Sequence, residues 1–385
     1  MAGTRLCQHI STARSLRASE QTGATMKLKR SWVAGLISLV VVLIFSLTFL
    51  GSDEQHRSQL NPAPMVAPDR RIEVGIHIKT IYNLSLKDKT FNADGWFWLK
   101  WPESIQQQIE ADRIPINQLV ELVNQVETYD SNLEMDNNEP QRLKDGRYLQ
   151  LFRFSSKFYD ERQNLRNFPF ERIELPISIE IRPSQFSMGN QGVVLVPKLN
   201  ARELQGDSIH LNGYMLEGSN NTSAIHVYQT TFGDKSSTRA GEFSQATFEV
   251  TYHTNGWASF YSFVLPWMAV MVILMLAPNL EGNLNDLRLA IPSTALLTLV
   301  FLQEGAHSDL PPLGYLTYLD KLYLFGYLAA TAEFCLFVWS TNLFSRASSE
   351  EHSAVMARIN RVDLTYQLCS IAGMVCLLLL GRTAN

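Results

Sequence analysis

The stretch ASFYSFVLPWMAVMVILMLAPNL, residues 258–280, carries no charged side chain and decides the class of this protein. A helix needs about 20 predominantly apolar residues to cross the hydrocarbon core of a bilayer. Three further apolar segments follow it, at residues 289–303, 322–344 and 364–381. The pattern predicts four membrane-spanning helices within residues 255–385.

The overall composition hides these segments because they are averaged with a polar region. The chain of 385 residues is 18% charged and has a mean hydropathy of −0.05. Its 33 Lys and Arg are outnumbered by 37 Asp and Glu, which excludes a strongly basic nucleic-acid binder. None of the 4 cysteines lies in the polar region, and no zinc-type cysteine spacing occurs. We therefore expect no disulfide framework there, no metal site and no cofactor.

The polar region, residues 71–254, has the pattern of a β-domain. Ile72–Lys79 alternates apolar with polar or small residues, and Trp96–Trp101 is rich in aromatic side chains. Only Ser104–Asp112 and Gln118–Gln125 have a helical pattern. Further strands are expected at Tyr148–Phe154, Ile173–Ile181, Gly192–Pro197, Ser223–Thr231 and Ala246–Tyr252. Short strands separated by turn-rich segments predict a β-sandwich or a barrel.

The first 70 residues are expected to hold a targeting segment. Residues 1–30 form a tail that ends in a basic cluster, and residues 31–52 are apolar. This order is typical of a secretory signal peptide or of an uncleaved signal anchor, and both alternatives stay open. A start at Met26 would give a conventional signal. Residues 53–70 contain three prolines and are expected to form an exposed linker.

The positive charges predict an orientation in the membrane. One basic cluster, Lys27–Arg30, precedes the first apolar run, and Arg346, Arg358 and Arg361 lie between the third and fourth predicted helices of the C-terminal region. Cytoplasmic loops carry an excess of Lys and Arg. With both groups in the cytoplasm, the β-domain lies outside, in a multi-pass protein of the plasma membrane.

Four motifs occur in an order and at a spacing typical of one receptor family. They are TFNADGWFWLKW at residues 90–101, NFPFERIEL at 167–175, LPW at 265–267 and LPPLGYLTYLD at 310–320. With these motifs the chain resembles the pentameric ligand-gated ion channels, or Cys-loop receptors, in their prokaryotic form without the loop cysteines. The resemblance implies an extracellular ligand-binding β-sandwich followed by a four-helix transmembrane bundle. It also implies a homopentamer that conducts ions when a small-molecule ligand or a proton binds.

The second apolar segment carries a stripe of residues that predicts a pore lining. The stripe recurs every three or four residues, as one face of a helix does, and consists of Asp286, Ala290, Thr294, Leu297, Phe301, Glu304 and Ser308. Around a five-fold axis, Leu297 and Phe301 would form apolar rings that gate by dewetting. Rings of Asp286 and Glu304 would favour cations. The alternatives are ordinary packing for the apolar pair and solvated helix ends for the acidic pair.

Two residues of the apolar segments have more than one interpretation. Pro292 lies within the predicted pore helix and either bends it for gating or is simply tolerated. Glu333 is an ionisable group within an apolar segment, so it is functional, part of a buried pair or at an interface.

The resemblance also implies a surface that couples the sandwich to the pore. Its residues lie in three loops: Lys87, Asp88, Phe168, Pro169, Phe170, Glu171, Pro311, Tyr315 and Asp320. Members of the family usually have an arginine at the end of the last strand, where this chain has Thr254. The neighbouring His253 is a candidate partner for Glu171 when its ring is protonated, which would make coupling depend on pH.

Ligands of the family bind between subunits in a box of aromatic side chains that attracts ammonium groups. By position, the candidates in this chain are Tyr129, Phe186, Tyr228 and Phe232. Each could instead be an ordinary core or surface aromatic. The W-x-P-D segment of the family is not recognisable here, so the ligand class stays open.

The sequence contains no motif typical of a hydrolase, a nucleotide-binding enzyme or a metalloprotease. We therefore expect neither enzymatic activity nor a catalytic residue. A transmembrane ligand sensor of the same fold that conducts no ions is the alternative to a channel.

Overall fold

The computed structural model describes residues 60–127, 129, 132–186, 192–198, 205–230, 241–280, 284–348 and 350–380. Contacts divide the chain into two units, Met1–Asp53 and Glu54–Asn385, and every described residue belongs to the second. The expected tail and targeting segment lie outside the described residues.

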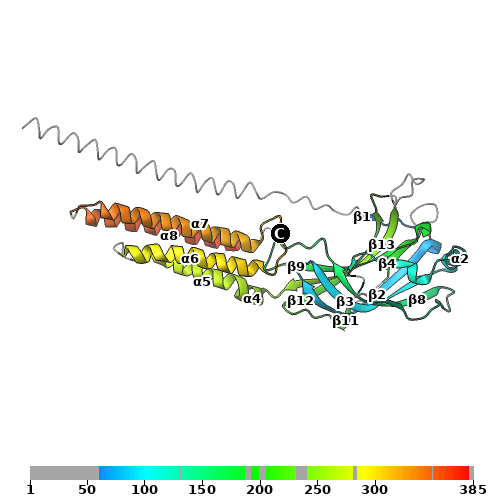
Figure 1. The fold of residues 1–385 in the computed structure, drawn as a ribbon. Coiled ribbons are helices and arrows are strands. Elements are labelled where there is room, and N and C mark those ends of the chain that lie inside the picture. The colour runs from blue at the N-terminus through cyan, green and yellow to red at the C-terminus, as the bar shows by residue number, and fades with distance from the viewer. Residues whose placement is uncertain are drawn as a thin grey trace, which may run out of the picture. The chain divides into compact units, whose positions relative to one another are not determined.

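Two β-sheets make up the part of the chain before the helices (Figure 1). One sheet has the order β1-β12-β13-β9-β4, with bounds β1 (Leu60–Pro62), β12 (Tyr214–Val227), β13 (Glu242–Thr254), β9 (Arg172–Ile181) and β4 (Val120–Leu122). The other has the order β10-β2-β3-β8-β5, with bounds β10 (Val194–Pro197), β2 (Arg71–Ser85), β3 (Thr90–Trp101), β8 (Tyr148–Tyr159) and β5 (Gln125–Val126). Three short strands extend it: β11 (Gln205–Ser208) pairs with β2, and β6 (Asn132–Met135) and β7 (Gln141–Arg142) pair with β8.

Alternating side chains from the two sheets form one shared apolar core. The even-numbered residues of β2 from Ile72 to Ile78 are fully buried, and so are Phe97 and Leu99 of β3. Ile177 of β9 and Phe248 of β13 belong to the same core from the other sheet. Because successive strand residues point to opposite faces, this alternation turns one face of each sheet inward. The predicted β-rich region is confirmed, and its sheets form a sandwich.

One predicted helix of this region is present and one is not. The helix α2 (Glu103–Ala111) covers nearly the range expected. No helix forms at Gln118–Gln125, where the short 3₁₀ turn η2 (Ile116–Gln118) leads into β4 and β5. Val120 and Leu122 pair with the edge of β9 and are buried there, and such tertiary pairing overrides a short helical pattern.

The strand expected at Ser223–Thr231 is also displaced. β12 begins at Tyr214 and includes Gly218 and Asn221, which are residue types that favour turns. Both lie in the ladder with β13, next to a bulge between Leu216 and Gly218. Cross-strand pairing along the length of β13 therefore outweighs the local turn preference.

Four helices that are long and apolar enough to cross a membrane follow the sandwich. The first, Gly256–Asn279, is composed of α4 (Gly256–Ser259), η5 (Phe260–Val264), α5 (Leu265–Leu276) and η6 (Ala277–Asn279). The others are α6 (Asn285–His307), α7 (Tyr318–Ser345) and α8 (His352–Leu380). The predicted succession of a β-rich region and four apolar helices is therefore confirmed.

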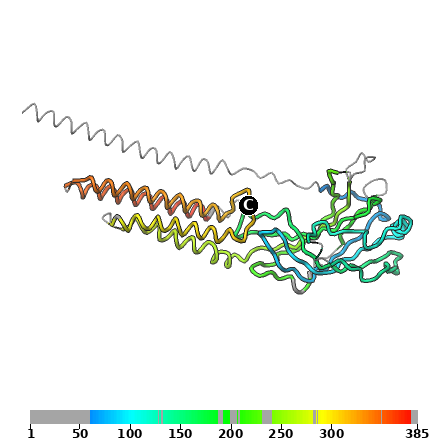
Figure 2. The backbone as a smooth tube through the Cα atoms, in the orientation of Figure 1, coloured from blue at the N-terminus to red at the C-terminus, as the bar shows by residue number. Residues whose placement is uncertain are grey.

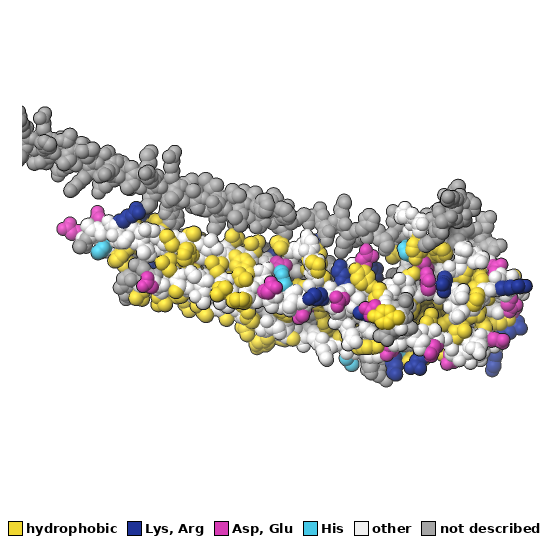
Figure 3. Space-filling model, in the orientation of Figure 1, with side chains coloured by type: hydrophobic (Ala, Val, Ile, Leu, Met, Phe, Trp, Pro, Cys, Tyr) yellow, Lys and Arg dark blue, Asp and Glu magenta, His cyan; other side chains and the backbone are white. Residues whose placement is uncertain are grey.

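The helices α5 to α8 run side by side, and α6 packs on both α5 and α7 (Figure 2). On the face drawn in Figure 3, hydrophobic side chains predominate along the middle of the helices, while charged side chains gather over the sandwich. A Cβ on Gly326 of α7 would lie 3.0 Å from Leu299 Cδ1 and 3.2 Å from Trp267 Nε1. Glycine at this position therefore permits the close approach of α7 to α5 and α6.

The first helix contains a π-helical turn, η5, directly before Pro266. A proline has no N–H to donate and its ring collides with the carbonyl four residues earlier in a regular α-helix. A wider π turn relieves both conflicts, and such turns occur mostly as single insertions in α-helices.

Candidate functional site

The predicted pore stripe lies on the exposed face of α6. Every member, from Asp286 to Ser308, is exposed, and the exposed fractions of Leu297 and Phe301 are 57% and 68%. The opposite face of the helix is buried against the bundle through Arg288, Ala295, Leu299 and Ala306. The seven stripe residues therefore share one surface, which the described part of the chain leaves uncovered.

Pro292 lies in the buried face of α6, and the helix continues past it to His307. Because proline has no N–H, the carbonyl of Arg288 lacks its usual helical donor. The hydroxyl groups of the next two residues donate back to carbonyls of the preceding turn, a contact that often accompanies a bend in a helix. Ser293 Oγ donates to the carbonyl of Leu289 at 2.9 Å, and Thr294 Oγ1 donates to that of Ala290 at 2.9 Å.

A buried ion pair joins α6 to α8 among the apolar side chains. Arg288 Nη2 lies 2.5 Å from Asp363 Oδ2, and the exposed fractions of these side chains are 2% and 4%. The guanidinium also lies 4.2 Å from the ring centroid of Phe337 on α7, a cation–π contact. Neither charged residue was among the sequence-predicted site residues. A charged residue near the start of each apolar segment is the only sequence signal that points to them.

Glu333 of α7 lies in the field of this pair and is fully buried. Neither of its carboxylate oxygens has a hydrogen-bond partner within the described part of the chain. A buried ion pair is thus present in this part of the bundle, but Arg288 and Asp363 form it. Glu333 lies beside the pair and is not a member of it.

The loop at residues 160–171 is hydrogen-bonded to the segment that links α6 and α7. The Leu165 N–H donates to the Tyr315 hydroxyl at 3.0 Å, and the Arg166 guanidinium lies 4.8 Å from the Tyr315 ring centroid. The N–H of Tyr318 donates to the Arg166 carbonyl at 2.8 Å. The N–H of Leu319 donates to the Phe168 carbonyl at 3.1 Å. The loop is therefore attached to the first turn of α7 through its backbone.

Apolar contacts strengthen this junction. Phe168, which precedes a cis peptide bond to Pro169, is buried with the helix core and lies edge-on to Phe263 at 5.0 Å. Phe170 lies 6.1 Å from the ring of Tyr318. Leu86, in the turn between β2 and β3, packs against both the sandwich core and the helix core. Sequence reasoning missed Leu86 and Phe263, because nothing local marks a leucine or a phenylalanine as a contact between two cores.

The other predicted coupling residues have different surroundings. Lys87 and Asp88 lie exposed in the turn between β2 and β3, where Asp88 Oδ2 accepts a hydrogen bond from Ser85 Oγ at 2.8 Å. Pro311 is buried in the linker before α7. Lys87 and Asp88 therefore lie in a turn of the sandwich, and Pro311 lies in the linker between α6 and α7. Asp88 also stabilises its own turn through Ser85.

Asp320 connects the end of α6 to the start of α7. Its Oδ2 accepts hydrogen bonds from the N–H and the hydroxyl of Thr317, at 2.9 and 2.8 Å, which completes a capping box for α7. Its Oδ1 lies 2.6 Å from His307 Nε2 and accepts a longer hydrogen bond from Gln303 at 3.3 Å. One carboxylate therefore connects the first turn of α7 to the C-terminal end of α6.

Glu171 does not have the partner expected from the sequence. Its carboxylate is almost fully buried, and Oε1 accepts a hydrogen bond from the Tyr214 hydroxyl at 2.9 Å. Burial raises the pKa of Glu171, although its own backbone N–H and Tyr214 oppose the rise. His253 is exposed on β13, and the neighbouring Thr254 N–H donates to the Glu171 carbonyl at 3.2 Å. Tyr214, not His253, therefore holds Glu171.

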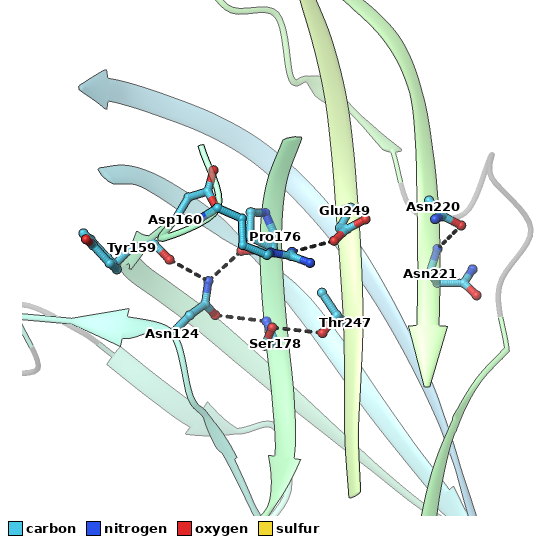
Figure 4. Close-up of polar contacts among 10 residues, drawn as sticks. Asn124, Tyr159, Asp160, Pro176, Ser178, Asn220, Asn221, Thr247 and Glu249 are labelled. Atoms are coloured by element: carbon cyan, nitrogen blue, oxygen red, sulfur yellow. Dashed lines mark hydrogen bonds and ion pairs between the residues drawn. The ribbon is translucent and has the colours of Figure 1, made fainter. Parts of the chain in front are cut away.

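A polar network crosses between the two sheets near the same loop (Figure 4). The Asn124 amide donates to the carbonyls of Tyr159 and Pro176, at 3.2 and 2.7 Å, and its oxygen accepts from the Ser178 N–H at 3.0 Å. Tyr159 ends β8, whereas Pro176 and Ser178 belong to β9, so the Asn124 side chain joins the two sheets. Ser178 in turn contacts the Thr247 hydroxyl of β13 at 3.0 Å.

The predicted ligand-binding aromatics fall into unlike environments. Tyr129 is 87% exposed, whereas Phe186 is fully buried in the sandwich core. Core packing therefore accounts for Phe186, whose ring is not accessible to a ligand. Phe232 lies outside the described residues.

Tyr228 belongs to an acidic and aromatic cluster at the end of β12. Its hydroxyl donates to Glu180 Oε1 at 2.9 Å, and His226 Nδ1 lies 2.9 Å from Glu180 Oε2. The Tyr228 ring lies 4.1 Å from that of His226 and 5.8 Å from that of Phe243. Burial and the adjacent Glu180 raise the pKa of Tyr228, so its hydroxyl remains a donor at neutral pH.

Comparison with known proteins assigns no family to the chain. A scan against models of protein families found no match, and a search of curated proteins found none either. The functional interpretation therefore depends on the motifs and contacts described above.

Proposed function

We propose that this chain is one subunit of a homopentameric ligand-gated ion channel in a bacterial plasma membrane. The sandwich lies outside the cell and α6 lines the pore. The observation that carries the proposal is the uncovered face of α6. Along that face, acidic residues stand at both ends, small and hydroxyl residues follow the inner end, and apolar residues lie between.

A comparison with α8 supports a water-lined surface for α6. The exposed residues of α8 in its apolar part include Leu364, Leu368, Ile371 and Val375, which suit contact with lipid. The exposed residues of α6 also include apolar ones such as Leu297 and Phe301, but Asp286, Thr294 and Glu304 are exposed beside them. Ionisable side chains within membrane segments generally face a bundle interior or a water-filled path.

The chemistry of the stripe suggests how the pore works. Five copies of Leu297 and of Phe301 would form two apolar constrictions that exclude water when narrow and admit it when wider. Rings of Asp286 and Glu304 at the two mouths would concentrate cations and repel anions. The proposed pore therefore favours cations.

The contacts at the junction supply a route from the sandwich to the pore. A rearrangement of the sandwich on ligand or proton binding would move the loop at 160–171, which is bonded to Tyr315, Tyr318 and Leu319. The shift would reach α6 through Asp320, because this carboxylate contacts both His307 and Gln303. The contacts of the loop with the linker, and those of Asp320 with α6, are direct hydrogen bonds between named groups.

Accessibility of introduced cysteines tests the proposed pore. We expect a charged thiol reagent to block currents of the Thr294→Cys channel at least about tenfold faster than those of a Leu299→Cys channel, because only the first position is exposed. Both variants are made in a background without the native cysteines and recorded in planar bilayers. Equal rates at the two positions would contradict the proposal. An assembled pentamer that stays electrically silent over a range of pH and ligands favours the non-conducting sensor.

A further inference from the structure

A cavity of about 650 Å³ opens on the face of the eight-stranded sheet that points away from the core. Glu73 and His77 of β2, and Trp98 and Lys100 of β3, line it, alternating along their strands with residues of the sandwich core. Arg147, just before β8, and Lys198, just after β10, complete its wall. The volume lies within the range of about 300–1,000 Å³ that is usual for small-molecule sites.

The indole of Trp98 forms a flat surface in this cavity. Trp98 stands opposite Gly75 in the ladder between β2 and β3. A Cβ on Gly75 would lie 2.2 Å from the Cε2 and Cζ2 atoms of the indole, so any other residue would displace the ring. Glycine thus allows the indole to lie across the backbone of β2, where it presents an aromatic face to a ligand.

The charges of the lining are unequal, because three cations surround one carboxylate. Lys198 Nζ lies 2.9 Å from Glu73 Oε1, and Arg147 Nη1 lies 2.9 Å from Glu73 Oε2. Both carboxylate oxygens are therefore engaged. Partial burial opposes ionisation, but the hydrogen bonds and charges of Lys198 and Arg147 hold the pKa of Glu73 below its usual value. Glu73 is a carboxylate at neutral pH and contributes one negative charge.

Lys100 carries the excess positive charge. It stands directly opposite Glu73 in the ladder, but the two oxygens of Glu73 are taken by the other cations. Among the residues that the structure describes, no hydrogen bond or ion pair is made by the Lys100 ammonium. Arg147 also binds Asp145 at 2.6 Å, outside the lining. The charge of Asp145 acts on Lys100 too, but the two form no ion pair, so the Lys100 ammonium still has its hydrogen-bond donors available for a ligand.

We propose that this cavity binds a small organic anion with a flat ring, such as an aromatic carboxylate, with the ring on Trp98 and the anionic group on Lys100. The proposal deepens the proposed function, since it names a ligand class for the sandwich. It also narrows the ligand class that the sequence left open, because an ammonium group would meet a net positive lining in this cavity. Binding itself requires no ion conduction.

Calorimetric titration of the full-length protein in lipid nanodiscs tests the site, with sodium benzoate as the probe. We expect saturable binding of benzoate and at least about tenfold weaker binding of benzylammonium, which has the opposite charge. Lys100→Gln should weaken benzoate binding at least about tenfold, whereas Lys100→Arg should retain it. Lys79→Gln is the matched control, because Lys79 is exposed on β2 outside the lining and its loss should change nothing.

Three results would overturn the proposal: no saturable benzoate binding, equal binding of benzylammonium, or unchanged binding in the Lys100→Gln protein. A melting curve of each variant checks its fold, and Trp98→Ala provides a second variant that removes the ring without changing a charge. Currents are measured separately. Benzoate binding by a silent protein would refute the channel but not the cavity site, and currents without benzoate binding would refute only the site.

Discussion

Asp160 shows how burial of a single side chain makes stability depend on pH. The residue is 3% exposed, and its Oδ1 accepts a hydrogen bond from the Arg162 N–H at 3.1 Å. Arg162 also forms an ion pair with Glu249 of β13 at 2.6 Å. Burial raises the pKa of Asp160 to about 6, an effect that Arg162 opposes and the charges of Glu174 and Glu249 increase.

The sign of the pH effect follows from the raised pKa. The folded protein holds the Asp160 proton more tightly than the unfolded chain, whose carboxyl titrates near 3.8. The stability that the protonated form contributes is therefore complete below about pH 4 and is lost as the pH rises to about 6. We expect Asp160→Asn to stabilise the protein by up to about 2 kcal/mol more at about pH 7.5 than at about pH 4.5.

Melting curves of the purified protein at the two pH values measure this difference. Asp112→Asn, which changes an exposed aspartate at the end of α2, serves as the control and should show no such dependence. If Asp160→Asn changes the melting temperature by the same amount at both pH values, burial does not raise the pKa of this carboxyl.

Among the elements, α6 and α8 are joined by the buried pair of Arg288 and Asp363. Removing one partner leaves a charge without its counterpart in an apolar surrounding, which typically destabilises a protein by about 3 kcal/mol or more. We expect Asp363→Asn alone to lower the melting temperature in nanodiscs strongly. The double variant Arg288→Met with Asp363→Leu should recover most of that loss, because no buried charge remains at the pair.

A matched control for this pair is available on the same helix. Arg361 of α8 is exposed, so Arg361→Gln should change the melting temperature little. If the single and double variants lose the same stability, the pair is not coupled.

For the molecule as a whole, the connection between the sandwich and the helices depends on few polar contacts. Tyr315→Phe removes the hydroxyl that accepts the Leu165 N–H but keeps the ring beneath Arg166. A hydrogen bond of this kind contributes about 0.5–1.5 kcal/mol, so we expect the stimulus for half-maximal current to rise about two- to tenfold. Concentration–response curves of the assembled channel measure the ligand or proton concentration that gives half-maximal current.

The control for the junction is Tyr261→Phe, since Tyr261 is 62% exposed on the first helix. It removes a hydroxyl of the same kind outside the contact between loop and linker. Similar curves for the wild type and the Tyr315→Phe channel, at equal amounts of assembled protein, would show that this contact does not transmit the stimulus.

Local sequence patterns were sufficient to predict an element where one periodicity, of a strand or of a helix, dominates. The alternation from Ile72 to Ile78 predicted β2, and the positions from Asp286 to Ser308 were predicted to share one helix face, which the structure exposes together. At Gln118–Gln125 the pattern is short and weak, and pairing with β9 decided the outcome. The partner of Glu171 was mispredicted because Tyr214 is distant in the sequence and a hydroxyl carries no charge that a pattern could reveal.

The sequence by itself determined the β-rich region, the four apolar helices and the stripe on α6, because length, hydropathy and helical period are local properties. Only the tertiary structure decided which distant groups meet. It brings Glu73 within 2.9 Å of Lys198, 125 positions away, and Arg288 within 2.5 Å of Asp363. Such pairs form when strands and helices pack, since a buried charge requires a partner wherever the fold can supply one.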